Sequence, residues 1–129
     1  MVDAIVIRAN SHQTVERFAA HSRVPVINAL TDWHHPCQLL ADIQTWIEHR
    51  GNITGKTAAW IGDGNNVCHS WIHATRPFGF KLRIATPKGY EPKQEIVATA
   101  SNNVVLLHDP AAAARGADLV VTDTWASMG

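Results

Sequence analysis

The sequence has 129 residues, of which 46% are hydrophobic and 17% charged, and eleven basic residues balance eleven acidic ones. This composition is typical of a folded domain, not of a disordered segment. A net charge of zero gives no reason to expect nucleic acid or an anionic membrane as a partner. No apolar run reaches the roughly 18 residues that a membrane-spanning helix needs. The two cysteines, Cys37 and Cys68, form no C-x-x-C pair. We expect both to be reduced thiols, which indicates a cytoplasmic location.

Short apolar runs, typical of strands, alternate with helical patterns along the whole chain. In chain order, the expected elements are a strand over 4–7, a helix over 11–21, a strand over 24–28, a helix over 36–49, a strand over 57–62, a helix through 72 that ends near 77–79, a strand over 82–86, a helix from 92, a strand over 104–107, a short helix from 110 and a strand over 119–122. This alternation predicts an α/β fold, a parallel sheet with helices on both faces. The continuous apolar character of the strands predicts that both of their faces are buried.

The helix over 36–49 is long, and it is apolar around much of its circumference. It is expected to link two sheets, and Gly51 follows its end as a helix-terminating residue. We therefore place a domain boundary near Gly51, between residues 1–50 and residues 51–129. The chain begins directly in a strand and stops just after a strand and a turn, which predicts an internal piece of a longer protein.

Four motifs resemble ligand sites but lack essential parts. The P-loop-like stretch over 51–57 is one residue too short between its glycines, and it follows a helix instead of a strand. Gly62-Asp-Gly64 lacks the third glycine of a dinucleotide loop. The histidines and cysteine of 34–37 are too crowded for tetrahedral zinc, and His69 and His73 lack the glutamate of H-E-x-x-H. We therefore expect no triphosphate, NAD or metal site.

Polar residues follow several of the expected strands, at the sheet edge where α/β proteins bind ligands. His35-Pro-Cys-Gln38 stands at a helix start, where free N–H groups favour an anion and an imidazole could polarise a carbonyl oxygen. A structural interpretation, in which His35 only caps the helix, is equally open at this point. Asn65 and Asn66 follow a glycine-rich turn, and Asp123 follows a very apolar strand. Asparagine is also an ordinary turn residue.

Taken together, these segments resemble the transcarbamylase family at three separated places. His35-Pro-Cys-Gln38 is similar to the family's H-P-x-Q carbamoyl phosphate motif, and the segment 62–66 is similar to a loop of the ornithine enzymes. The segment 123–129 resembles the D-x-x-x-S-M-G loop, which separates ornithine from aspartate enzymes. The resemblance covers essentially the whole chain. It implies the end of a first domain that binds carbamoyl phosphate, plus most of a Rossmann-like second domain that binds ornithine.

The resemblance implies an ornithine carbamoyltransferase, which transfers the carbamoyl group of carbamoyl phosphate to the side-chain amine of L-ornithine. The products are L-citrulline and phosphate, a step of the arginine biosynthesis or urea cycle type. Arg8 and His35 would contact carbamoyl phosphate and act catalytically, by stabilising charge on its carbonyl oxygen. Gln38 would bind the carbamoyl amino group. No metal or organic cofactor is implied, and Cys37 occupies a variable position without a role.

The second substrate would be held by residues from the later part of the chain. The resemblance implies that Asn66 and the backbone N–H of Met128 bind the ornithine carboxylate. Asp123 and Ser127 would bind its α-amino group. A homotrimer, with sites shared between subunits, is also implied.

The family's S-T-R-T-R and H-C-L-P motifs are not found in the sequence. We therefore expect this polypeptide alone to be inactive. Two alternatives stay open. The first is a transcarbamylase for another amine, against which Asp123, Ser127 and Met128 argue. The second is a non-catalytic α/β ligand-binding module.

Overall fold

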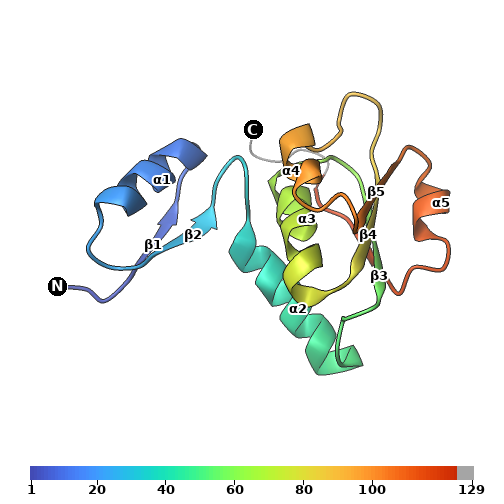
Figure 1. Cartoon of the computed structure of the whole chain (residues 1–129), viewed down its shortest axis with the longest axis horizontal. Helices are drawn as coiled ribbons and strands as arrows, with labels where there is room; N and C mark the ends of the chain where they lie inside the picture. The colour runs from blue at the N-terminus through green and yellow to red at the C-terminus, as the bar shows by residue number, and fades with distance from the viewer. Residues whose placement is uncertain (125–129) are drawn as a thin grey trace.

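The computed structural model describes residues 1–124, which form two parallel sheets connected by helices (Figure 1). The smaller sheet pairs β1 (Ile5–Arg8) with β2 (Val26–Leu30). The larger sheet has the strand order β5-β4-β3-β6. Its strands are β3 (Thr57–Ile61), β4 (Lys81–Ala85), β5 (Val104–Leu107) and β6 (Leu119–Val121). The predicted α/β fold with parallel strands is confirmed, and the strands fall close to the expected ranges.

Five helices connect the described strands: α1 (His12–His21), α2 (Pro36–Arg50), α3 (Asn66–Phe78), α4 (Gln94–Ala98) and α5 (Pro110–Ala114). Local residues explain where the longer ones begin and end. Ser11 caps α1 by accepting a hydrogen bond from the Thr14 N–H. Pro36 opens α2, where no backbone N–H is needed. Gly79 ends α3 in the left-handed conformation, with a φ of 68°.

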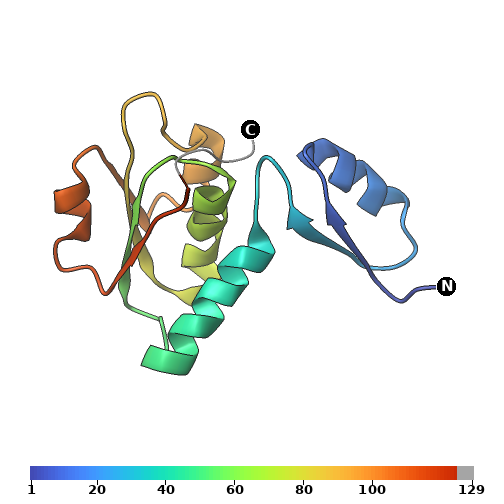
Figure 2. The same cartoon turned by 180° about the vertical axis from the view of Figure 1, so that it is seen from behind.

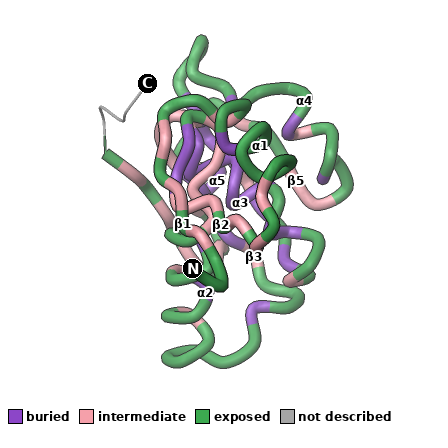
Figure 3. The backbone as a smooth tube through the Cα atoms, turned by 90° about the vertical axis from the view of Figure 1, so that its left-hand side faces the viewer, coloured by how far each residue is buried: buried purple, intermediate pink, exposed green. Residues whose placement is uncertain are grey.

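The helices cover the larger sheet unequally. Helices α3 and α4 lie on one face with α2 beyond them, and α5 lies on the other face (Figures 1 and 2). The α3 side holds the main core, which includes the fully buried Trp60, Trp71 and Phe80. The α5 side packs through small residues such as Ala59 and Ala113. Figure 3 shows the buried backbone concentrated in α3 and the centre of the sheet.

The prediction that the strands bury both faces is wrong for every strand except β3 and β4. Val6 and Ile27 are exposed on the smaller sheet, and Val105 and Val120 are exposed on the strands that flank the larger one. In residues 1–124 no helix covers the face of the smaller sheet that carries Val6 and Ile27. Val105 and Val120 lie on the α5 face of the larger sheet, but the five-residue α5 packs over Ala59 and Ala85 and leaves these outer positions exposed. Strands β3 and β4 lie at the centre between two helical layers. Phe18 of α1 is also exposed.

Helix α2 runs from the smaller sheet to the start of β3, as expected for a linking helix (Figure 2). It ends at Gly51, whose N–H donates to Ile47 and whose φ is 78°. The division of the chain into residues 1–50 and 51–129 stays a prediction.

The strand order of the larger sheet changes direction at β3. Strands β4 and β5 follow one another on one side of β3, whereas β6 lies on its other side, although all four strands are parallel. In parallel sheets a crevice forms beyond the carboxyl ends of the strands at such a reversal. The loop of residues 62–65 follows β3, and residues 122–124 follow β6. Both predicted ornithine segments therefore begin at this point.

No helix within residues 1–124 is both long enough and apolar enough to cross a membrane.

The loop of residues 62–65, which follows β3, packs closely against the backbone of residues 90–92 at Gly64. The Gly64 N–H donates to the Tyr90 carbonyl at 2.8 Å, and a Cβ at Gly64 would lie 2.6 Å from the carbonyl carbon of Glu91. We predict that Gly64→Ala lowers the free energy of unfolding by about 2 kcal/mol, because the clash is with backbone that cannot rotate away. Urea unfolding measures this change. Gly51→Ala is the control: it meets no atom within 4 Å but has a positive φ, so it should cost about 1 kcal/mol. Equal losses in both variants would contradict the packing role of Gly64.

Candidate functional site

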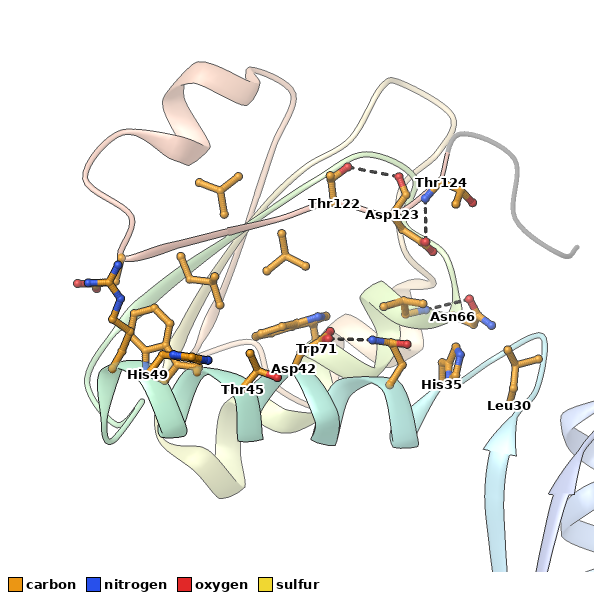
Figure 4. A pocket seen from close by; sticks show the side chains of 18 of the residues that line it. Leu30, His35, Asp42, Thr45, His49, Asn66, Trp71, Thr122, Asp123 and Thr124 are labelled. Atoms are coloured by element: carbon orange, nitrogen blue, oxygen red, sulfur yellow. Dashed lines mark hydrogen bonds between the residues drawn. The ribbon is translucent and has the colours of Figure 1, made fainter.

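The cleft that contains most of the predicted site residues lies between α2, α3 and β6 and has a volume of about 910 Å³ (Figure 4). Arg8 from the end of β1 borders it, together with His35 and Gln38 from the start of α2. Asn66 from the start of α3 and Asp123 from the end of β6 complete this set. Five residues predicted from four separate elements thus line one cavity.

His35 occupies the N-cap position of α2, but its side chain makes no capping hydrogen bond. The structure thus confirms that His35 stands at the start of α2, but it shows no capping by the side chain. Its backbone N–H donates to the Ser70 hydroxyl at 2.8 Å, which ties the start of α2 to α3. The ring Nδ1 is buried and has no hydrogen-bond partner among the described residues. A buried nitrogen of this kind normally finds a partner, and residues 1–124 provide none.

Gln38 lies one helical turn before Asp42, which sequence reasoning missed. The Gln38 Nε2 donates to Asp42 Oδ1 at 2.8 Å. This hydrogen bond turns the amide so that its nitrogen points to Asp42 and its oxygen points away. Asp42 and Gln38 both border the cleft. The i, i+4 spacing was the available signal, since it places the two side chains on one helix face.

Asn66 is buried, with 4% of its surface exposed, at the first turn of α3. Its Nδ2 donates to the Thr31 carbonyl at 2.8 Å, and its Oδ1 accepts from the Val67 N–H at 2.9 Å. In this structure the Asn66 amide therefore holds the loop between β2 and α2, and it also reaches the cleft wall.

Asn65, rather than Asn66, contacts Asp123. The Asn65 Oδ1 caps α3 by accepting from the Val67 and Cys68 N–H groups. Its amide nitrogen must then point outwards, and it donates to Asp123 Oδ2 at 2.8 Å. This contact joins the carboxyl ends of β3 and β6 across 58 residues of sequence. Asp123 Oδ1 accepts from the Thr124 N–H at 2.7 Å. Sequence analysis singled out the pair Asn65 and Asn66, but it did not predict the contact of Asn65 with Asp123.

The other predicted ornithine ligands, Ser127 and Met128, lie outside the described residues. Asp123 and Thr124, the described residues before them, border both the main cleft and a smaller cavity of about 290 Å³. Ile61, Gly62 and Asp63 line that smaller cavity from the end of β3. The start of the predicted ornithine loop therefore lies at the point where the strand order reverses.

Beside the cleft, four histidines far apart in the sequence come together. This histidine cluster consists of His12, His34, His69 and His73. The His34 ring centre lies 5.0 Å from that of His12, 6.1 Å from that of His69 and 4.9 Å from that of His73. Sequence analysis weighed His34 in one set and His69 with His73 in another, and it did not consider His12. Within residues 1–124, no group of three or more His, Cys, Asp or Glu residues is arranged to hold a metal ion.

Three members of the histidine cluster, His34, His69 and His73, resist protonation. Burial is the largest cause that lowers the pKa of His34 to about 4, followed by His73, His12 and His69, while Asp32 opposes the shift. Burial is also the first cause that lowers the pKa of His69 and of His73. At neutral pH these rings are therefore uncharged and can pack together without repulsion.

Comparisons with known proteins agree with this arrangement. The family described as "Aspartate/ornithine carbamoyltransferase, Asp/Orn binding domain" matches residues 54–129. The companion "Aspartate/ornithine carbamoyltransferase, carbamoyl-P binding domain" matches residues 1–48. The chain belongs to the aspartate/ornithine carbamoyltransferase family. The resemblance seen in the sequence is thereby confirmed.

Curated relatives in this family are ornithine carbamoyltransferases. The one from Chromohalobacter salexigens is 64% identical over 129 residues, and the match covers all of this chain and 42% of that protein. An anabolic ornithine carbamoyltransferase from Pseudomonas aeruginosa is 60% identical, again over all of this chain and 42% of the relative. This chain therefore spans less than half the length of the curated relatives it matches.

Solved structures of ornithine carbamoyltransferases share the fold. The enzyme from Burkholderia thailandensis superimposes with a TM-score of 0.93 at 52% identity, over 97% of this chain and 43% of that one. The enzyme from Pyrococcus furiosus gives a TM-score of 0.90 at 44% identity, over 98% and 42%. Both sheets and their connecting helices are thus arranged as in the transcarbamylase fold.

The Asn65–Asp123 contact can be tested with two substitutions that both keep a capping oxygen. We predict that Asn65→Asp is less stable than Asn65→Ser by about 1 kcal/mol at neutral pH, because a second carboxylate would face Asp123. Urea unfolding at low and high salt measures the difference, which should shrink as salt screens the repulsion. Equal stability at low salt would show that Asn65 does not face Asp123.

The lowered pKa of His34 predicts acid sensitivity with a definite sign. In the unfolded chain the pKa of His34 is about 6.5, so between pH 6.5 and the folded value of about 4 the unfolded chain binds more protons. Stability contributed by neutral His34 is therefore present above pH 6.5 and falls as the pH drops through this window. His34→Gln should remove about 1 kcal/mol of this dependence, a value reduced for the partial exposure of the ring. Urea unfolding from pH 7 to pH 4.5 measures it, and parallel pH profiles for the two proteins would contradict the prediction.

Proposed function

We propose that this chain is part of an ornithine carbamoyltransferase, which makes L-citrulline and phosphate from carbamoyl phosphate and L-ornithine. One observation carries the proposal: predicted ligands of both substrates line the same cleft. They come from regions that match two different substrate-binding domains of the family. The names of the curated relatives support ornithine over aspartate as the acceptor.

The carbamoyl phosphate end of the cleft is proposed to consist of Arg8, His35 and Gln38. Arg8 is a permanent cation, and His35 has a buried Nδ1 for which the described residues provide no partner. Both would stabilise the negative charge that develops on the carbonyl oxygen as the carbamoyl carbon is attacked. The Gln38 oxygen, turned away from Asp42, would accept a hydrogen bond from the carbamoyl amino group.

The ornithine end is proposed to consist of Asp123, Ser127, Asn66 and the backbone N–H of Met128. Asp123 would bind the α-amino group together with Ser127. Its carboxylate is oriented by Asn65, which supports this role because a fixed acceptor loses little entropy on binding. Asn66 and Met128 would bind the carboxylate. To do so, Asn66 would have to release the hydrogen bond that its amide donates to the Thr31 carbonyl, or share that donor with the carboxylate, when substrate enters.

Transfer requires the side-chain amine of ornithine to lose a proton before it attacks. Its pKa in water is like that of lysine, about 10.4, and removal from water would lower it. The amine then forms a bond to the carbamoyl carbon, and the bond from that carbon to the phosphate oxygen breaks. Fixing two small substrates at adjacent positions supplies much of the acceleration. The proposed reaction needs no metal or organic cofactor, because the carbamoyl carbon is already activated by its phosphate.

We further propose the organisation of the whole protein. Residues 1–50 would form the end of a carbamoyl phosphate-binding domain with its linking helix, and residues 51–129 part of the ornithine-binding domain. The whole protein would be a cytoplasmic homotrimer, and the free thiols of Cys37 and Cys68 are consistent with a reducing compartment. The polypeptide of 129 residues alone would not catalyse transfer, because the sequence has no S-T-R-T-R motif to grip the phosphate.

Citrulline formation by the full-length protein tests the proposal. We expect His35→Ala to lower kcat about 100-fold, as removal of one donor to a developing oxyanion does elsewhere. His21→Ala, at the end of α1 and not among the residues that line the cleft, is the control and should stay within about twofold. No citrulline from the unsubstituted protein with carbamoyl phosphate and ornithine would overturn the proposal. Phosphate release with a different amine in place of ornithine would favour the alternative transcarbamylase.

A further inference from the structure

One face of α3 holds the loop that delivers His35. Asn66, His69 and Ser70 stand at i, i+3 and i+4, and each has 4% or less of its surface exposed. Asn66 donates to the Thr31 carbonyl, and Ser70 accepts from the His35 N–H, each at 2.8 Å. His69 Nδ1 lies 2.8 Å from the carbonyl oxygen of Trp33, midway along the same loop. Three side chains of one helix thus bind alternate residues of the loop.

The two partners of His69 fix the position of its proton. A carbonyl oxygen can only accept, so the Nδ1 beside Trp33 must carry the hydrogen. The His69 Nε2 lies 3.1 Å from the backbone N–H of Lys93, which can only donate, so Nε2 must be unprotonated. His69 is therefore a neutral imidazole in its Nδ1–H form. In this form it connects the β2–α2 loop to the start of α4.

The groups around His69 favour the neutral form. His34 faces it from the β2–α2 loop and His73 from the next turn of α3. Lys93 faces it from the N-cap of α4, and Asp63 from the loop after β3. Burial is the largest cause that lowers the pKa of His69, and Lys93 and His73 add to it. The Trp33 hydrogen bond and Asp63 act in the opposite direction. A proton on Nε2 would also point at the Lys93 N–H and break that hydrogen bond.

We propose that His69 is a positioning residue, which as a neutral Nδ1–H imidazole holds the Trp33 carbonyl and thereby sets the backbone that places His35 in the cleft. The proposal rests on the proposed role of His35 as a ligand of carbamoyl phosphate. His69 itself touches no substrate in this scheme: it acts two residues away, through the loop backbone.

Nitrogen NMR of the histidine rings tests the first half of the proposal without any substitution. In the unsubstituted protein at pH 6, below the ordinary histidine pKa of about 6.5, we expect His69 Nδ1 to be protonated and Nε2 not. A doubly protonated ring at this pH, or the opposite tautomer, would overturn the proposal.

Two substitutions separate the two hydrogen bonds of His69. Asparagine places its amide nitrogen near the position of Nδ1, so His69→Asn keeps the Trp33 contact and loses Lys93. Glutamine reaches the position of Nε2, so His69→Gln keeps the Lys93 contact and loses Trp33. We expect the His35 amide to exchange with solvent on the order of fivefold faster in His69→Gln and within twofold of the unsubstituted rate in His69→Asn. His73→Gln, in the same cluster without a contact to the loop backbone, is the control. Equal exchange in both His69 variants would overturn the proposal.

Kinetics of the full-length protein complete the test. His69→Gln should raise the KM for carbamoyl phosphate and lower kcat by about tenfold, while the KM for ornithine changes less than twofold. A loss confined to the KM for ornithine would overturn the positioning of His35. If the unsubstituted protein forms no citrulline, the proposed function fails. The tautomer and exchange measurements then still decide whether His69 holds the loop.

Discussion

The junction between helix α3 and the β2–α2 loop is the constraint on which the site depends. Asn66, His69 and Ser70 are buried polar side chains, and each is satisfied by the backbone of the loop. Burying such groups without partners would cost several kcal/mol, so the loop and the helix fit in one relative arrangement. The loop belongs to the part of the chain matched by the carbamoyl phosphate-binding domain, and α3 to the part matched by the Asp/Orn-binding domain. The same hydrogen bonds that join the two parts therefore position His35 between them.

The larger sheet contributes the second half of the site through its strand order. The reversal at β3 brings the end of β6 beside the end of β3, and the Asn65–Asp123 hydrogen bond joins them there. The Asn65 side chain makes two sets of hydrogen bonds, and one set fixes the other. Its oxygen caps α3, which forces its nitrogen toward Asp123. The start of α3 is thus coupled to the carboxylate proposed to bind the ornithine amino group.

The histidine cluster extends this junction into a pH-sensitive part of the molecule. His34 and His69 pack ring to ring beside the cleft while both are neutral. Protonation of His34 would place a charge among three other imidazoles, and protonation of His69 would break a hydrogen bond to α4. We therefore expect acid to weaken the loop and the contacts that hold His35 together.

The sequence by itself determined the order of the elements, the ends of several helices and the family. Ser11, Pro36 and Gly79 act within one turn of chain, so their effect on a helix end can be predicted from neighbours alone. The H-P-x-Q and D-x-x-x-S-M-G segments indicated the family for a similar reason, since each motif is contiguous. Only the tertiary structure decided that Val6 and Val120 are exposed and that Asn65 faces Asp123. It alone also decided that His69 joins Trp33 to Lys93. These contacts join residues that are distant along the chain, and strand order, not local sequence, sets which of them meet.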